Sequence, residues 1–195
     1  MDARAHGRNV GSEWDGPLAE FSALREEIQA RVQAQNQVLS LQLTVTAAIF
    51  GFSMSRQNMT TLLLLVPFTS YLLCGRLASH HFGTVKAAQY ISEELSKQVP
   101  GGLRWEQWLR RSRKGPSLLG STLPLLLTFV GASVLALAWV GWYIYAHGDA
   151  DTIPRAGLIA LWILGFIPAA LSAWLVLQMD GRTSAGLRKK AAKSR

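Results

Sequence analysis

The sequence predicts an all-α membrane protein with four transmembrane helices in two hairpins, an N-terminal cytosolic helix and a cytosolic helical segment between the second and third spans. Four runs of 24, 19, 34 and 24 residues contain no Asp, Glu, Lys or Arg, and they make up 101 of the 195 residues. A helix of about 20 residues crosses the hydrocarbon layer of a bilayer, so each run is long enough for one span. Lys and Arg gather between and after the predicted hairpins, as they do on the cytoplasmic side of membrane proteins.

This charge distribution excludes several classes of protein as main interpretations. A soluble domain interleaves charged and apolar residues, because each helix or strand turns one face to water. We therefore exclude a soluble enzyme, a nucleic-acid-binding domain and a disulfide-stapled secreted module. The single cysteine, Cys74, leaves no internal disulfide framework and is expected to be a buried thiol.

The N-terminal part of the chain predicts a helix that continues into the membrane. Residues 1–16 are rich in Gly, Asp and Arg without apolar periodicity, and we expect them to be disordered. A cytosolic amphipathic helix is predicted over 17–37, since Pro17 suits a first helical turn. No Gly or Pro interrupts 18–50, so this helix should run into the first span. Its apolar side chains recur every three or four positions: Leu18, Phe21, Leu24, Ile28 and Val32.

The first predicted hairpin covers 38–77, with spans at 38–54 and 59–77 joined by a tight turn. The first span is the most polar of the four. Its polar side chains can hydrogen-bond to a neighbouring helix, or they can line an aqueous pore in an oligomer. Small side chains also share one face, where a second helix could approach closely: Ser40, Thr44, Ala47, Ala48 and Gly51. The candidates for helix packing or pore lining are therefore Ser40, Gln42, Thr44, Thr46 and Gly51.

Residues 78–118 are predicted to form a cytosolic helical and interfacial segment. An amphipathic helix is expected near 84–98, ending at the Pro-Gly-Gly of 100–102. Neither this helix nor the N-terminal one can hide its apolar face alone, so we expect them to pack on each other or on a partner. The partner-binding candidates are Phe21, Leu24, Ile28, Ile91 and Leu95. A basic element at 103–114 is typical of a helix at a membrane surface, with Trp105, Trp108, Arg110 and Arg111 as interface candidates.

The second predicted hairpin covers 119–179, with spans at 123–145 and 155–179, followed by a basic cytosolic tail at 180–195. Aromatic residues near the end of the third span are typical of the membrane–water interface: Trp139, Trp142, Tyr143 and Tyr145. The fourth span has a small-residue packing face at Gly165, Ala169 and Ala173. Pro67 and Pro168 each lie in the second span of a hairpin, where a proline either kinks the helix or is tolerated.

The distribution of Lys and Arg predicts the orientation. Residues 78–118 hold seven and 182–195 hold six, whereas the turns at 55–58 and 147–155 hold one each. The positive-inside rule therefore places both termini in the cytoplasm of a multi-pass protein of the cell (inner or cytoplasmic) membrane. The net charge of +8 indicates contact with the anionic cytoplasmic leaflet rather than with nucleic acid.

A search for reactive groups gives no catalytic, cofactor-binding or metal-binding candidate. The interior of each span lacks Asp, Glu, Lys and Arg, which ion-coupled transporters, proton pumps and voltage sensors use. His80 and His81 occupy adjacent helical positions, whose side chains point about 100° apart, a poor geometry for chelation. Glu93 and Glu94 are expected to be exposed charges. We therefore expect neither enzyme activity nor a cofactor.

Three stretches resemble an uncharacterised family of small bacterial (actinobacterial-type) four-span integral membrane proteins. They are 20–55 (EFSALREEIQARVQAQNQVLSLQLTVTAAIFGFSMS), 63–73 (LLLVPFTSYLL) and 89–110 (QYISEELSKQVPGGLRWEQWLR). The resemblance implies a helix leading into a membrane hairpin, then a cytosolic helix and a Gly-Trp-like element. Here Arg104 stands before Trp105, where that pattern would have Gly. It implies no activity. A looser, architectural likeness is to membrane-hairpin effectors of bacterial defence systems.

Three functional hypotheses follow. The main one is a non-catalytic integral membrane protein that acts as an oligomeric or partner-binding module, either with copies of itself or with another membrane or cytosolic protein. The first alternative is a pore-forming membrane effector, which the polar side chains of the first span favour. A small membrane enzyme using His80, His81, Glu93 or Glu94 is the remaining alternative.

Overall fold

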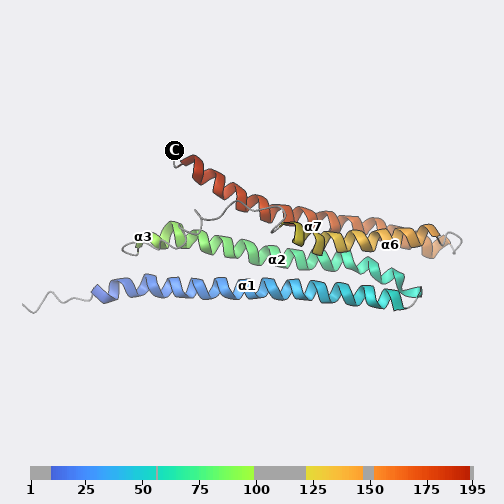
Figure 1. Ribbon diagram of the computed structural model, residues 1–195, viewed down its shortest axis with the longest axis horizontal. Helices are drawn as coiled ribbons and strands as arrows, with labels where there is room; N and C mark the ends of the chain where they lie inside the picture. Colours follow the sequence, from blue (N-terminus) through green and yellow to red (C-terminus); the bar gives the residue numbers. More distant parts are fainter. Residues whose placement is uncertain (1–9, 56, 99–121, 147–151, 194–195) are drawn as a thin grey trace, which may run out of the picture. The chain divides into compact units, whose positions relative to one another are not determined.

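The computed structural model describes residues 10–55, 57–98, 122–146 and 152–193. Every element within these residues is a helix (Figure 1), so the all-α prediction is confirmed for them. The chain divides into two compact units. The first unit comprises Met1–Ala34 and His80–Lys114, and the second comprises Gln35–Ser79 and Gly115–Arg195.

Among the described residues, four helices are long and apolar enough to cross a membrane. Their bounds are Asp15–Ser55, Met59–Gln98, Leu123–Ala146 and Ala156–Asp180. The four predicted spans fall on these four helices. Because a helix satisfies its own backbone hydrogen bonds, it is the structure that an apolar segment of this length adopts in a bilayer.

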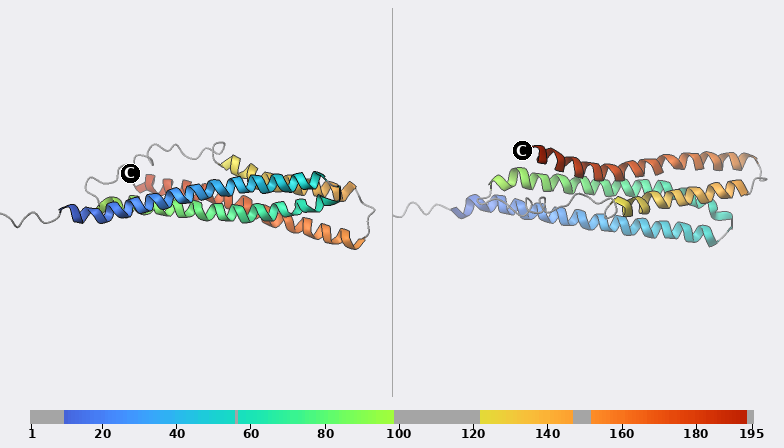
Figure 2. Two further views of the ribbon diagram at one scale, coloured as in Figure 1. Left: turned by 90° about the horizontal axis from the view of Figure 1, so that it is seen from below. Right: turned by 45° about the horizontal axis from the view of Figure 1, so that its top comes forward.

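Helix α1 is a single 46-residue helix, Val10–Ser55 (Figure 2). It continues without a break into the first candidate span, as the sequence predicts. Its start differs from the prediction, because residues 10–16 are helical where disorder was expected. Pro17 lies inside α1. A proline removes one backbone hydrogen bond and strains the helix locally, but the turns on either side can still form. Residues 1–9 lie outside the described residues.

The long helix that contains the second candidate span changes helix type along its length. A 3₁₀-helix, η1 (Gln57–Leu64), leads into α2 (Leu65–Tyr90), which is followed by a π-helical turn, η2 (Ile91–Leu95), and by α3 (Ser96–Gln98). The sequence predicts a uniform α-helix with Pro67 near its middle. In the structure Pro67 lies in the first turn of α2. Proline has no backbone N–H, so residue 67 donates no hydrogen bond to a carbonyl of η1. This position is one at which a proline is tolerated.

The third and fourth candidate spans lie side by side in the second unit (Figure 2). The third consists of α5 (Leu123–Leu126), a π-helical turn η4 (Leu127–Gly131) and α6 (Ala132–Ala146). The fourth is α7 (Thr152–Lys193), which continues beyond the predicted span end into the basic tail. The predicted interfacial element at 103–114 lies outside the described residues.

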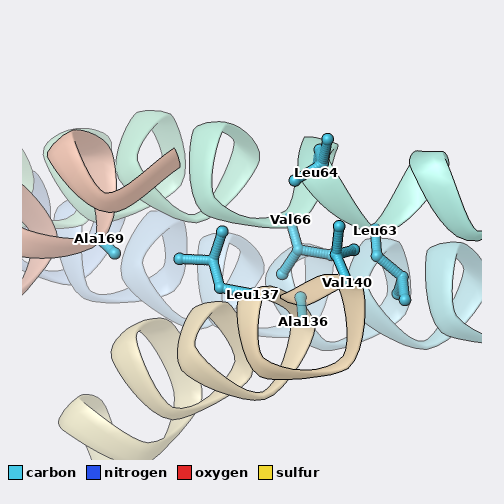
Figure 3. Close-up of a cluster of buried hydrophobic side chains, with 7 residues drawn as sticks. All are labelled: Leu63, Leu64, Val66, Ala136, Leu137, Val140 and Ala169. Atoms are coloured by element: carbon cyan, nitrogen blue, oxygen red, sulfur yellow. The ribbon is translucent and has the colours of Figure 1, made fainter. Parts of the chain in front are cut away.

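A hydrophobic cluster joins three of the four candidate spans in the second unit (Figure 3). Val140 of α6 lies between Val66 of α2 and Leu63 of η1, and Leu137 of α6 lies between Val66 and Ala169 of α7 (Figure 3). The complete cluster is Leu63, Leu64, Val66, Ala136, Leu137, Val140 and Ala169. Ile49 and Phe50 of α1 pack against it, so α1 belongs to the same bundle.

Candidate functional site

One face of α1 is turned into the second unit and carries the polar residue Gln42. Its side chain is fully buried, at 0% exposure. The Gln42 Nε2 donates to Ser70 Oγ of α2 at 2.7 Å and to Thr46 Oγ1, one turn further along α1, at 3.1 Å. Ser53 Oγ on the same face donates to the Met59 backbone oxygen at 3.3 Å. The inner face of α1 is therefore tied by hydrogen bonds to the helix that follows it.

The opposite face of α1 carries the small residues that the sequence singles out. Residues 42 and 51 are nine positions apart, which at about 100° per residue puts them on opposite sides of the helix. A Cβ atom added at Gly51 would meet nothing within 4 Å. Thr44 Oγ1 on this face donates to the Ser40 backbone oxygen at 2.9 Å, within the same helix. All five small residues are exposed: Ser40, Thr44, Ala47, Ala48 and Gly51. We call them the outward face of α1.

The predicted small-residue face of α7 is turned inward. Gly165 and Ala169 are buried and Ala173 is half-buried. A Cβ atom added at Gly165 would lie 2.8 Å from Leu137 Cδ2 and 3.7 Å from Pro67 Cγ. Gly165 therefore allows α7 to approach α6 and α2 closely, as small residues do between membrane helices.

A second contact between α6 and α7 was missed by the sequence analysis. The Trp162 Nε1 donates to the Leu137 backbone oxygen at 2.7 Å. A Cβ atom added at Gly141 would lie 3.1 Å from Trp162 Cζ2. Gly141 stands one helical turn after Leu137, so its lack of a side chain leaves room for the indole beside that carbonyl. The only signal in the sequence is a glycine inside the aromatic end of the third span, opposite a tryptophan in the fourth.

Buried hydroxyl and thiol groups of the second unit bond mainly to backbone carbonyls. Ser133 Oγ donates to the Phe129 oxygen and Ser172 Oγ to the Pro168 oxygen, each at 2.8 Å. Both serines are 0% exposed. The Cys74 thiol, also fully buried, lies 3.7 Å from the Ser172 backbone oxygen. These contacts use the polar groups to hold helices in place rather than to line an open space.

In the first unit, α1 and α2 are joined by a hydrogen bond from the Tyr90 hydroxyl to Glu20 Oε1 at 2.8 Å. This bond, and the negative charge of Glu20, raise the pKa of the Tyr90 phenol above its ordinary value. A second contact joins the same two helices. The Arg31 guanidinium of α1 lies over Gly83 of α2, where a Cβ atom would collide with it. Arg31 Nε also donates to Glu27 Oε1 at 2.9 Å.

The predicted partner-binding residues all lie in this first unit. Ile91 and Leu95, in the π-helical turn η2, are fully buried. Phe21, Leu24 and Ile28 of α1 are half-buried. The Phe21 ring has the Arg25 guanidinium carbon 5.1 Å from its centroid, a cation–π contact. An apolar stripe on α1 therefore stays partly accessible beside the Tyr90–Glu20 bond.

Of the predicted membrane-interface residues, four can be placed. Trp139, Trp142 and Tyr145 of α6 are exposed and Tyr143 is half-buried. The Trp142 ring lies against the ring of Tyr145, with their centroids 6.3 Å apart. The remaining four, Trp105, Trp108, Arg110 and Arg111, lie outside the described residues.

Among the described residues, no group of three or more His, Cys, Asp and Glu side chains could hold a metal ion. Comparisons with protein-family models, curated proteins and solved structures found no match to this chain. The family resemblance noted in the sequence therefore stays a prediction.

Proposed function

We propose that the protein is a non-catalytic integral membrane protein that associates with a second copy of itself through the outward face of α1. The observation that carries this proposal is the opposition of the two faces of α1. One face is occupied by hydrogen bonds and packing within the chain, through Gln42 and Ile49. The other face consists of five small exposed residues. Small residues on a membrane helix allow a second helix to approach until backbone atoms make van der Waals contact.

Insertion in a membrane is supported by the apolar side chains that the bundle leaves exposed. Phe52, Met54, Leu72 and Trp142 are each between 66% and 73% exposed. A water-soluble protein would hide many of these side chains, whereas lipid tails cover them without cost. The four charge-free runs, together with the Lys and Arg counts, support the cell membrane with both termini in the cytoplasm.

The polar side chains of the first span favour association over an aqueous pore. A pore needs these groups to face a water-filled path. Gln42 and Thr46 are instead bonded to each other, and Gln42 also to Ser70. Thr44 donates to a carbonyl of its own helix. The hydrogen-bonding capacity of the span is therefore used mainly inside the chain, which supports a packing role.

The proposal is tested by measuring association in liposomes with two glycine variants. Donor- and acceptor-labelled copies are mixed, and energy transfer is followed as the protein is diluted in lipid. Gly51→Leu places a large side chain on the outward face and should weaken association roughly tenfold, or about 1.4 kcal/mol. Gly75→Leu in α2 is the matched control, because a Cβ atom at either glycine would meet nothing within 4 Å.

Two outcomes would contradict the proposal. One is energy transfer no greater than random proximity in the unmodified protein. The other is equal association of the two leucine variants, since the contact surface would then lie elsewhere.

A further inference from the structure

The amide of Gln42 is only half satisfied by the protein. A glutamine side chain offers two N–H donors and an oxygen with two lone pairs. Both hydrogen bonds of Gln42 use Nε2, with Ser70 Oγ and Thr46 Oγ1 as the acceptors. In the described part of the chain, its Oε1 is buried and has no hydrogen-bond partner.

Turning the amide over would exchange the positions of its two polar atoms. Oε1 would then accept hydrogen bonds from the Ser70 and Thr46 hydroxyls, which can act as donors as well as acceptors. The Nε2 group would then need an acceptor at the position that Oε1 faces now. In the orientation that the structure shows, Oε1 faces a position from which no described group donates a hydrogen bond. Buried polar atoms in folded proteins are nearly always paired, and ordered water completes those that the protein leaves open.

The chemistry of the surroundings restricts what can occupy this position. No Asp, Glu, Lys or Arg lies between 32 and 55 or between 57 and 75, so neither stretch supplies an opposite charge to balance a bound ion. Gln42 and Ser70 are both 0% exposed, which favours a small guest. The two hydroxyls can each donate to or accept from that guest. A small, neutral molecule that both donates and accepts hydrogen bonds fits these conditions.

We propose that the bundle holds an isolated water molecule at the unpaired amide atom of Gln42, between α1 and α2. The water donates to Oε1, or accepts from Nε2 if the amide is turned over. The hydroxyls of Ser70 and Thr46 provide its further partners. The site is independent of any association between copies, since it lies on the inner face of α1.

Nuclear magnetic resonance tests the site directly on the unmodified protein in lipid nanodiscs. Glutamine side chains and tryptophan indoles are labelled with ¹⁵N, and magnetisation transfer from water to their N–H protons is recorded. The Gln42 signal, identified by its loss in Gln42→Met, should show transfer from water. The indole N–H of Trp162 is the dry control, because it is already bonded to the Leu137 oxygen at 2.7 Å. Gln29, exposed on α1, is the hydrated control.

Hydroxyl protons that exchange with water can relay such a signal, so the measurement is repeated in the double variant Ser70→Ala with Thr46→Val, which has neither hydroxyl. Transfer to Gln42 that persists in the double variant supports a bound water. Absence of transfer in the unmodified protein, with a normal signal at Gln29, would overturn the proposal, and so would its loss in the double variant. An ion leak through liposomes that disappears in Gln42→Met would also overturn it, because a continuous water path would then replace an isolated site.

Discussion

The contact of Trp162 with α6 leads to a quantitative prediction about Gly141. The Trp162 Nε1 donates to the Leu137 oxygen at 2.7 Å. A Cβ atom at Gly141 would lie 3.1 Å from Trp162 Cζ2 and 3.4 Å from both Cε2 and Nε1. Those contacts are tighter than normal van der Waals packing allows, so in Gly141→Ala the rigid indole must move by a few tenths of an ångström. The same movement lengthens its hydrogen bond.

The opposing contributions to the free energy of unfolding can be compared. Replacing Gly by Ala within a helix stabilises it by about 1 kcal/mol. Weakening an interhelical hydrogen bond in a membrane costs about 0.6 kcal/mol and at most about 1.7 kcal/mol. Overpacking adds a cost of about 1 kcal/mol. We therefore expect Gly141→Ala alone to destabilise the protein by about 1 kcal/mol.

The sign of this effect should reverse when the indole is removed. Phe at position 162 can keep the edge-to-face contact with Phe166, whose ring centroid lies 5.0 Å from that of Trp162, but it lacks the N–H and the outer ring atoms. In a Trp162→Phe background, Gly141→Ala should stabilise by up to about 1 kcal/mol. The coupling energy between the two substitutions is then about 2 kcal/mol.

This double-mutant cycle can be measured in mixed micelles with a rising fraction of denaturing detergent. The unfolded fraction is read by brief proteolysis, which does not depend on tryptophan fluorescence. Additive effects of the two substitutions, within about 0.3–0.5 kcal/mol, would refute the reasoning. The absence of a side chain at Gly141 would then not be what allows the Trp162 indole to reach the Leu137 carbonyl.

Three further predictions concern other contacts. Gly165→Ala should destabilise by about 1–3 kcal/mol through overpacking, because its Cβ atom would lie 2.8 Å from Leu137 Cδ2. Gly75→Ala should not destabilise the protein, because a Cβ atom there has open space around it. Equal losses of stability for the two variants in the micelle assay would contradict this prediction. The pKa of the Tyr90 phenol should lie above its ordinary value of 10.0 because of the hydrogen bond to Glu20. The stability that this bond contributes is therefore fully present below pH 10.0 and is lost as the pH rises through the higher folded-state pKa. Ultraviolet titration of Glu20→Gln should show that pKa lowered, and an unchanged titration would contradict the role of the bond. Liposomes containing the protein should release ions no faster than empty ones, and a leak abolished by Gln42→Leu would instead favour the pore alternative.

The positions of the candidate spans could be predicted because they depend on one strong physical signal. A run of about 20 residues without charge has few alternatives to a helix in a bilayer. The helix types within the spans could not be predicted. The 3₁₀-helix before Pro67 and the π-helical turns of η2 and η4 depend on small differences in backbone hydrogen bonding, which leave no clear pattern in the sequence.

The start of α1 shows a second limit of the sequence analysis. The sequence favours Pro17 as a first-turn residue, yet the helix begins at Val10. Position N1 is where proline is most favourable, but the interior of a helix tolerates it when the flanking turns form. The choice between these positions depends on the turns before Pro17, whose Gly and Asp residues indicated disorder.

The two faces of α1 were both visible in the sequence, but their directions were not. Gln42 and the outward-face residues Ser40 and Thr44 are all polar enough to face a neighbouring helix. Ser70, 28 positions away along the chain, provides the partner that turns Gln42 inward. The indole bond of Trp162 likewise needs a carbonyl 25 positions away. Such pairings follow from the packing of two helices and not from the pattern of either one.

The central claim, that copies meet along the outward face of α1, is tested most directly by disulfide cross-linking in liposomes. In a Cys74→Ser background, single cysteines are placed along α1 and oxidised. We expect cross-linked dimers at Ser40, Thr44 and Gly51. Leu41 and Phe52 are also exposed, but they lie about 80° and 100° around the helix from the direction that Ser40, Thr44 and Gly51 share, so cysteines there should cross-link less. Cross-linking that is strongest at 41 and 52, or equal at all five positions, would contradict the claim.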